Sequence, residues 1–205
     1  MNPNQSPLEV SVTDLDLFRH WSEEEGLDTG WLLTKLLVRE QTDAMKAGSA
    51  FHKALENALE GDFTVVSADD YVFHFDCDME IAMPSIREGS MSKDYHGLLV
   101  KGRVDGVHGR TITEIKTTEQ FDPDRYLEGL QWKFYLDMTG CDRFDWHVFQ
   151  VRECGDKEYD VFGYHQLTQY RFVGLHEMCE RWTRDYKDFA ERFLVPELEK
   201  QVVQK

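Results

Sequence analysis

The sequence predicts an α/β protein in which a β-sheet is flanked by helices. Two observations lead to this class. Segments with helical spacing of apolar residues precede, interrupt and follow runs that are typical of strands. Hydrophobic residues make up 41% of the 205 residues, which is enough to bury one core. We therefore expect one domain at residues 13–205, ending in a helix, after a loose tail at residues 1–12.

Helices are expected in the first part of the chain. Thr13 can cap a short helix that runs to about residue 22, with acidic residues in its first turn. A second helix is expected at residues 31–45. Small residues at 47–49 interrupt the pattern, and a third helix is expected at residues 49–59. Its buried stripe recurs at every fourth position: Phe51, Leu55 and Leu59.

Strands are expected in the middle of the chain and again near residue 150. The runs typical of strands lie at residues 63–67, 71–76, 98–107, 111–117, 144–151 and 159–164. The last two are expected to form a hairpin around Gly155. Between the fourth and fifth runs, a helix is expected at residues 121–138, closed by Gly140. A long amphipathic helix at residues 172–193 follows and ends before Pro196.

The net charge of −16 argues against nucleic-acid binding, because phosphate contacts need Lys and Arg. The acidic residues are unevenly distributed, however. Residues 84–133 carry eight basic and eight acidic side chains, whereas residues 1–83 carry five and 17. Tight, non-specific DNA binding is therefore not expected, but the least acidic segment leaves room for a local site.

Composition also indicates where the protein works. No apolar run approaches the roughly 18–20 residues that a membrane span needs, and residues 1–10 do not resemble a signal peptide. We therefore expect a cytoplasmic protein with no membrane partner. The cysteines form no CxxC pair: Cys77, Cys141, Cys154 and Cys179. Reduced, mostly buried thiols are expected rather than disulfides.

A strand hairpin at residues 101–117 brings together side chains suited to phosphodiester hydrolysis. Glu114 and Lys116 are two apart, so they point to the same face of a strand. A turn at Gly109 places Asp105 opposite the neighbourhood of Glu114. Carboxylates bind hard cations such as Mg²⁺, and an ammonium group can position or deprotonate a water molecule and offset charge in the transition state. Ordinary half-exposed strands show the same pattern, so that alternative stays open.

Two helical segments add further polar residues. His52 offers a neutral imidazole, which is a good ligand for metals such as Mn²⁺, and small residues before it, including Gly48, permit a close approach of its helix. Gln131 and Tyr135 are four apart and share one helix face, where an amide and a phenol could hold phosphate oxygens or water. Each has a simpler explanation as a polar residue on a helix surface.

Basic residues near the hairpin are candidates for phosphate contacts. Arg103 is expected on the same strand face as Asp105, and the other candidates are Lys101, Arg125 and Lys133. Solvated surface charge is the alternative for each of them.

The order of these residues resembles the RecB-like exonuclease branch of the PD-(D/E)XK nuclease superfamily. The pattern is G-x-x-x-H with a following L-E, then D, then E-x-K-T, then Q-x-x-x-Y. In this chain it comprises Gly48, His52, Leu55, Glu56, Asp105, Glu114, Lys116, Thr117, Gln131 and Tyr135. Residues 12–18 also look like the short helix that often begins these domains, so the resemblance spans about residues 10–166. Each motif alone is weak, but four in this order are fairly specific.

The resemblance implies a restriction-endonuclease-like core with a central mixed β-sheet, and an active site that uses Mg²⁺ or Mn²⁺. The implied metal ligands are His52, Asp105, Glu114 and the carbonyl of Ile115. Lys116 would orient or activate the water, and Gln131 and Tyr135 would contact the DNA backbone near the cut. Val104 stands where the superfamily name has Pro, a departure common in this branch. The cysteine spacing differs from that of members with an iron–sulfur cluster, so no such cluster is expected.

The implied activity is that of a metal-dependent DNA exonuclease in recombination, repair or phage DNA processing. One alternative is a non-catalytic DNA-binding or protein-interaction module on the same fold, which the acidic composition favours. Another is a structure-specific endonuclease. DNA is the expected partner, while a recombination or replication protein partner and a homo-oligomer built through the C-terminal helix stay open.

Overall fold

The structure, a computed structural model, describes residues 8–58, 64–77 and 86–203. Its helices are α1 (Val12–Glu23), α2 (Thr29–Leu37), α3 (Asp43–Asn57), α4 (Pro123–Leu127), α5 (Gln131–Thr139), α6 (Leu175–Phe189), the π-helical turn η1 (Ala190–Leu194) and α7 (Val195–Val203). Its strands are β1 (Leu8–Ser11), β2 (Val65–Ala68), β3 (Tyr71–Phe75), β4 (Ile86–Tyr95), β5 (Leu98–His108), β6 (Thr111–Thr118), β7 (Arg143–Gly155) and β8 (Glu158–Tyr170). Leu59 and Phe63, which we assigned to a helix and a strand, lie outside the described residues.

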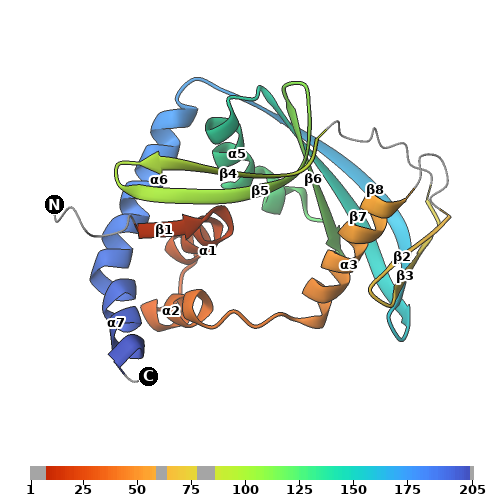
Figure 1. Cartoon of the computed structure of the whole chain (residues 1–205), viewed down its shortest axis with the longest axis horizontal. Helices are drawn as coiled ribbons and strands as arrows, with labels where there is room; N and C mark the ends of the chain where they lie inside the picture. Colours follow the sequence, from red (N-terminus) through yellow and green to blue (C-terminus); the bar gives the residue numbers. More distant parts are fainter. Residues whose placement is uncertain (1–7, 59–63, 78–85, 204–205) are drawn as a thin grey trace.

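All eight described strands belong to one mixed sheet, in the order β1-β5-β6-β7-β8-β3-β2, with β4 paired to β5 (Figure 1). The pairs β1–β5, β6–β7 and β3–β8 are parallel, and the others are antiparallel. The expected hairpin of the last two strands is present, because β7 and β8 pair on both sides of the turn after Gly155. The predicted α/β class with a central mixed sheet is therefore confirmed.

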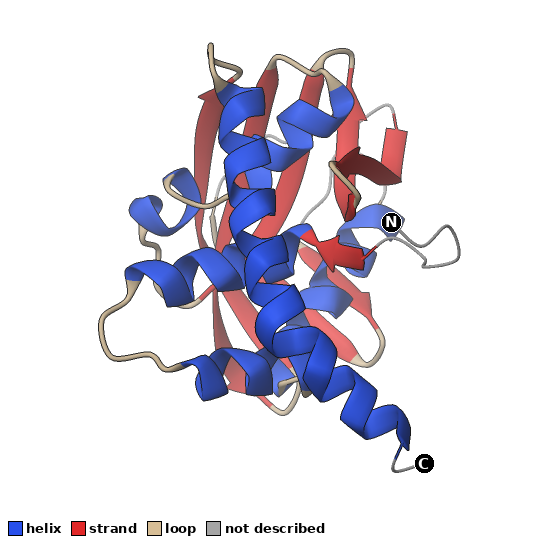
Figure 2. Ribbon diagram, turned by 90° about the vertical axis from the view of Figure 1, so that its left-hand side faces the viewer, coloured by secondary structure: helices blue, strands red, loops and turns tan. Residues whose placement is uncertain are grey.

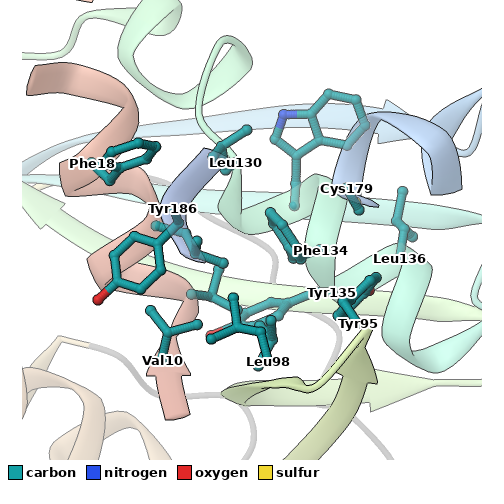
Figure 3. Close-up of a cluster of buried hydrophobic side chains, with 14 of the residues drawn as sticks. Val10, Phe18, Tyr95, Leu98, Leu130, Phe134, Tyr135, Leu136, Cys179 and Tyr186 are labelled. Carbon is teal, nitrogen blue, oxygen red and sulfur yellow. The ribbon is translucent and has the colours of Figure 1, made fainter. Parts of the chain in front are cut away.

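Helices cover the sheet on two sides. Helices α1, α5 and α6 pack on one another, and their apolar side chains form the larger core with β1, β5, β6 and β7 (Figures 2 and 3). Helix α3 contacts β2, β3 and β6 and forms a second cluster around Phe51, Phe73 and Phe149. The two clusters are made by alternate residues of the same strands, as a sheet covered on both faces requires.

Part of the expected N-terminal tail belongs to the sheet. Residues 8–11 form β1, which pairs in parallel with β5 from Leu98 to Lys101. The N-cap of α1 is Ser11 rather than Thr13: its side chain accepts from the Asp14 N–H, and the Asp14 side chain accepts from the Ser11 N–H. This capping box satisfies two main-chain N–H groups at once, those of Ser11 and Asp14. Thr13 lies inside the helix and does not cap it.

Two predicted helices are each divided into two. The prediction of one helix at 31–45 is wrong, because α2 ends at Leu37 and the Thr42 side chain accepts from the Met45 N–H to begin α3. Residues 47–49 then lie inside α3 and do not interrupt it. The predicted helix at 121–138 is α4 and α5, separated around Gly129. Gly140 ends α5 in the left-handed conformation (φ 73°), as predicted.

The C-terminal helix does not end before Pro196. It passes from α6 through η1 into α7, where Pro196 is the second residue. The Val195 N–H bonds to the Ala190 carbonyl, five residues back, so the hydrogen-bond spacing widens before the proline. A helix can accept a residue without an N–H at such a wider turn. Strand β4 was also not predicted, because its sequence, Ile-Arg-Glu-Gly-Ser-Met-Ser-Lys-Asp-Tyr, is mostly polar.

Candidate active site

The candidate site lies where β5 and β6 separate. One edge of β5 pairs with β1 up to Lys101 and with β6 from Gly106 onward. Neither of these ladders includes residues 102–105. We call this opening, between residues 102–105 of β5 and residues 114–116 of β6, the fork. It opens into a groove of about 1390 Å³ lined by α3, β4, β5, β6 and α5.

Asp105 bridges the fork. Its Oδ2 accepts a hydrogen bond from the main-chain N–H of Ile115 at 2.7 Å. Its other oxygen, Oδ1, lies 3.3 Å from Nδ1 of His52, a residue of α3. The Asp105 carboxylate thus takes the place of a main-chain acceptor in the sheet, and it satisfies the Ile115 N–H, which has no main-chain partner on β5 because the two strands are separated there. The predicted proximity of His52 and Asp105 is present.

Helix α3 can approach β6 closely because of Gly48. A Cβ at position 48 would lie 3.2 Å from the Thr117 Oγ1, tighter than most contacts of a real Cβ atom. The small residues before His52, which we interpreted as permitting a close helix approach, lie on α3 near this contact. The helix continues through these small residues.

Glu114 and Lys116 point to the same side of β6, as their spacing predicted. Lys116 Nζ donates to Glu114 Oε1 at 2.7 Å, and Gln131 Nε2 donates to the same oxygen at 2.5 Å. The other oxygen, Oε2, is buried and has no hydrogen-bond partner among the described residues. Glu114 as a whole is only 3% exposed. A buried carboxylate oxygen without a donor is costly and therefore needs an explanation.

Tyr135 closes the β5 side of the fork. Its hydroxyl donates to the Arg103 carbonyl at 2.9 Å and lies 3.4 Å from Gln131 Nε2. Its ring lies against Gly102, where an added Cβ would come within 2.3 Å of the ring. Position 102 must therefore be glycine for Tyr135 to lie where it does. Gln131 and Tyr135 meet on one face of α5 as predicted.

The charges at the fork shift one another's pKa values. Burial raises the pKa of the Glu114 carboxyl. The Lys116 ammonium lowers this pKa and the Asp105 carboxylate raises it, and the effect of burial leaves it raised overall. Burial pulls the pKa of Lys116 down, but the Glu114 and Asp105 carboxylates outweigh it and leave that pKa raised. For Asp105, burial acts upward, yet its hydrogen bond with His52 and the charges of His52 and Lys116 leave its pKa lowered. The fork therefore holds a carboxyl group with a raised pKa, Glu114, beside an ammonium group with a raised pKa, Lys116.

Two of the predicted phosphate-binding residues, Lys101 and Arg103, are exposed and already paired with carboxylates. Lys101 Nζ lies 2.5 Å from Glu9 Oε2, and Arg103 Nη1 lies 3.5 Å from Glu88 Oε1. Both line the groove, as does Arg125. Lys133 does not line this groove, and its Nζ donates to the Glu128 carbonyl at 2.7 Å. A phosphate at Lys101 or Arg103 would have to compete with a carboxylate.

Three residues near the fork were not identified from the sequence. Gly102 admits the Tyr135 ring, as described above. Trp146 lies beside Glu114 on β7 in the sheet register, and the Lys116 ammonium lies 5.9 Å from its ring centre. Asp16 of α1 accepts hydrogen bonds from the first turn of α5. No sequence pattern marks these residues, because each acts through a neighbour that is distant along the chain.

Metal ligands of the right kind are present but not gathered. His52, Asp105 and Glu114 offer one imidazole and two carboxylates, which suit Mg²⁺ or Mn²⁺ in kind. In the described part of the chain, no three His, Cys, Asp or Glu side chains already stand in a metal-binding arrangement. Among the described residues, the buried Oε2 of Glu114 has no hydrogen-bond donor, so a cation could be its partner. The donor set therefore fits such a cation, provided that the side chains close around it.

Other expectations concern the rest of the chain. All four cysteines are free thiols: Cys141 and Cys179 are buried, Cys77 is half-buried and Cys154 is exposed. Among the helices that the structure describes, none combines the length and apolar composition needed to span a membrane.

Proteins similar to this chain are found among solved structures. No family model matches the chain, and no curated protein matches its sequence. Among solved structures, the chain is similar to an alkaline exonuclease (LHK-Exo) from Laribacter hongkongensis, with 15% identity, a TM-score of 0.48, and coverage of 96% of this chain and 94% of that chain. The structure of LHK-Exo in complex with dAMP has 14% identity and a TM-score of 0.48, with coverage of 95% of this chain and 93% of that chain. The crystal structure of SSO0001 has 15% identity and a TM-score of 0.47, with coverage of 90% of this chain and 77% of that chain. At these identities and TM-scores, the likenesses do not decide what this chain does.

Proposed function

We propose that this chain is a divalent-metal-dependent nuclease, and specifically a DNA exonuclease that hydrolyses phosphodiester bonds. The observation that carries the proposal is the second carboxylate oxygen of Glu114, which is buried without a donor beside Asp105 and Lys116. A bound cation would satisfy that oxygen and would also offset the repulsion between the two carboxylates. Their position in an open groove, rather than in the core, supports a catalytic use over a structural one.

In this proposal the ion is held by His52, Asp105 and Glu114, with the carbonyl of Ile115 as a further ligand. Such an ion, when bound, polarises the phosphate and lowers the pKa of its water. His52 must be neutral to act as a ligand, and Glu114 must release any proton that its raised pKa retains. Metal binding should therefore strengthen as the pH rises.

The other residues of the fork act as donors and charges. Because the neighbouring carboxylates raise the pKa of Lys116, its ammonium stays protonated near neutral pH. Lys116 can therefore orient the attacking water and offset negative charge at the phosphate. Gln131 holds Glu114 at 2.5 Å and can turn its amide toward a phosphate oxygen. The Tyr135 hydroxyl, with its pKa raised by burial, remains a donor.

Two features favour a second candidate, a non-catalytic DNA-binding or protein-interaction module. The chain carries a net charge of −16, and the groove cations Lys53, Lys101 and Arg103 are each paired with a carboxylate. Both features weaken non-specific attraction to phosphates. Retention of every polar residue expected at the fork favours the enzyme.

A cleavage assay separates these candidates. End-labelled linear DNA and closed circular DNA are incubated with Mg²⁺, Mn²⁺ or EDTA and the parent protein, Lys116→Ala or Lys200→Ala. Lys200 is a matched control, because it is exposed on α7 and paired with Glu197 far along the chain from the fork. We expect metal-dependent loss of linear DNA alone, abolished by Lys116→Ala and retained by Lys200→Ala.

Each other outcome points elsewhere. Cutting of the circle would replace the exonuclease with an endonuclease, because a strict exonuclease needs an end. Binding of DNA or of a protein without cleavage under either metal would favour the non-catalytic module. Equal cleavage by Lys116→Ala and the parent would remove the fork from the mechanism.

A further inference from the structure

Helix α5 carries Gln131 and Tyr135 to the fork, yet it has no cap of its own. Its N-cap residue, Leu130, makes no side-chain hydrogen bond to the first turn. The cap comes instead from α1, more than 110 residues earlier in the chain. Asp16 Oδ1 accepts from the Leu130 N–H at 2.6 Å, and Oδ2 accepts from the Gln131 N–H at 3.2 Å. Both oxygens of one carboxylate therefore fix the start of α5.

This cap is directly linked to the fork. Gln131 connects the two. Its main-chain N–H donates to Asp16, and its side-chain amide donates to Glu114 Oε1 at 2.5 Å. A rotation or fraying of the first turn of α5 would move the Gln131 amide away from Glu114. The Tyr135 hydroxyl, one turn later on the same face, lies 3.4 Å from that amide and would be affected less.

Holding a carboxylate at this position has an electrostatic cost. Burial raises the pKa of the Asp16 carboxyl, although the N–H groups of α5 and the charge of Arg19 act in the opposite direction. Arg19 Nε lies 3.7 Å from Asp16 Oδ1, and Lys133 is a second nearby cation. The site thus supplies positive charge and two main-chain donors to keep an anion at the helix start.

We propose that Asp16 is a positioning residue of the nuclease site: by capping α5 it sets the place of the Gln131 amide against Glu114. The inference rests on the proposed function, since Gln131 and Glu114 matter for cleavage only if the fork is catalytic. It assigns to α1, which places no side chain against Glu114 or Lys116 among the described contacts, a part in organising the reaction.

The first test needs neither metal nor DNA. Amide hydrogen exchange at Leu130 and Gln131 and the NMR signals of the Gln131 side-chain amide are compared in the parent, Asp16→Ala and Asp14→Ala. Asp14 is the matched control, because it lies on the same helix, caps α1 and pairs with Arg39, but does not contact α5. We expect faster exchange and a shifted side-chain signal in Asp16→Ala alone. Unchanged exchange and signal in Asp16→Ala would overturn the inference whether or not the chain cleaves DNA.

The second test measures the coupling to catalysis. Asp16→Ala should lower kcat about tenfold with a smaller change in KM, because a misplaced Gln131 amide loses more interaction energy in the transition state than in the bound substrate. In a Gln131→Ala background the same substitution should cost nothing further. An equal loss in both backgrounds would show that Asp16 does not act through Gln131. If Asp16→Ala does not fold, Asp16→Asn keeps one acceptor oxygen and should give an intermediate loss in both tests.

These arms separate the two proposals. A parent that never cleaves DNA contradicts the proposed function, and the exchange data then decide on their own whether Asp16 positions Gln131. A parent that cleaves, together with an Asp16→Ala variant of parental kcat and parental exchange, contradicts only the inference about Asp16.

Discussion

Two buried carboxylates, Asp137 on α5 and Glu114 beside α5, differ in how their surroundings compensate their charge. Asp137, on the C-terminal half of α5, accepts hydrogen bonds at Oδ2 from Lys93 at 2.8 Å, Tyr95 at 2.6 Å and His176 at 3.0 Å. Burial acts to raise its pKa, but these donors outweigh it and leave the pKa lowered. Glu114, beside the N-terminal half, has a raised pKa and one oxygen without a donor.

The difference separates an acid whose charge the fold compensates from one whose charge the fold leaves uncompensated. Asp137 ties α5 to β4 and α6, and its donors repay the cost of removing the charge from water. For Glu114, the hydrogen bonds within the protein do not offset the free-energy cost of burying its charge, because Oε2 has no donor. Buried acids without a full set of donors are frequent at functional sites, because a bound ligand can supply the missing interaction.

The largest expected effect is on catalysis. Glu114→Gln should lower the rate of DNA cleavage on the order of 10³-fold or more, because the amide neither binds a divalent cation well nor pairs with Lys116. Asp137→Asn, the matched carboxylate-to-amide change, should retain most activity per folded molecule. Initial rates in excess Mg²⁺ or Mn²⁺, with the folded fraction measured in parallel, check both. Comparable losses in the two variants would erase the distinction drawn here.

The next effect is on stability. Asp137→Asn should lower the free energy of unfolding by about 3 kcal/mol, because an amide cannot accept from three donors and leaves Lys93 partly buried without its carboxylate. Urea unfolding at neutral pH measures the change. Since the folded pKa of Asp137 lies below the ordinary 3.8, its stabilisation is present above that value and is lost as the pH falls through the folded pKa. The variant and the parent should therefore converge in stability in acid, and parallel curves would contradict the role given to Asp137.

A smaller effect on stability is expected when Tyr135, a neighbour of Glu114, is displaced while both carboxylates are kept. Gly102→Ala should cost about 1–3 kcal/mol in unfolding free energy, because the new methyl group would lie 2.3 Å from the Tyr135 ring. Gly89→Ala on β4 is the control, since its Cβ would make an ordinary contact of 3.4 Å with Val104. The urea midpoints of the two variants and the Tyr135 ring signals report the outcome. A Gly102→Ala protein as stable as Gly89→Ala would mean that Tyr135 can move freely.

The smallest effect has the opposite sign. In the absence of metal, Glu114→Gln should stabilise the fold by about 1 kcal/mol, because removal of an unsatisfied buried charge outweighs the lost ion pair with Lys116, as the raised pKa of Glu114 indicates. The raised folded pKa of Glu114, above the ordinary 4.5, means that the parent loses stability as the pH rises through that pKa. The advantage of the variant should therefore grow with pH and vanish in acid. Added Mg²⁺ or Mn²⁺ should stabilise only the parent, and thermal unfolding with and without metal tests this.

Local patterns along the sequence predicted much of this arrangement. Alternation on β6 placed Glu114 and Lys116 together, and helical spacing placed Gln131 and Tyr135 on one face. The position of Asp105 followed from a two-strand hairpin, although the strands actually pair only from Gly106 onward. These successes share a cause, since each depends on the periodicity of a single element or on one short turn.

What could not be predicted depends on contacts between distant segments. Residues 8–11 read as a tail because a four-residue strand shows no pattern until β5 is beside it. Strand β4 is polar, and only its pairing with β5 makes it a strand. The cap that Asp16 gives to α5 spans more than 110 residues, so no local rule identifies it. Which acid is satisfied and which is not likewise depends on the folded chain.

The bridge made by Asp105 bears on how an inactive form of this protein should be made. Replacing Asp105 with alanine would remove a proposed metal ligand and would also leave the Ile115 N–H without its acceptor where β5 and β6 separate. Such a variant would confound lost chemistry with a loosened strand, and an exposed strand edge invites pairing with another molecule. Glu114→Gln leaves the Asp105–Ile115 link intact, so it is the better choice for trapping an uncut DNA end for structure determination.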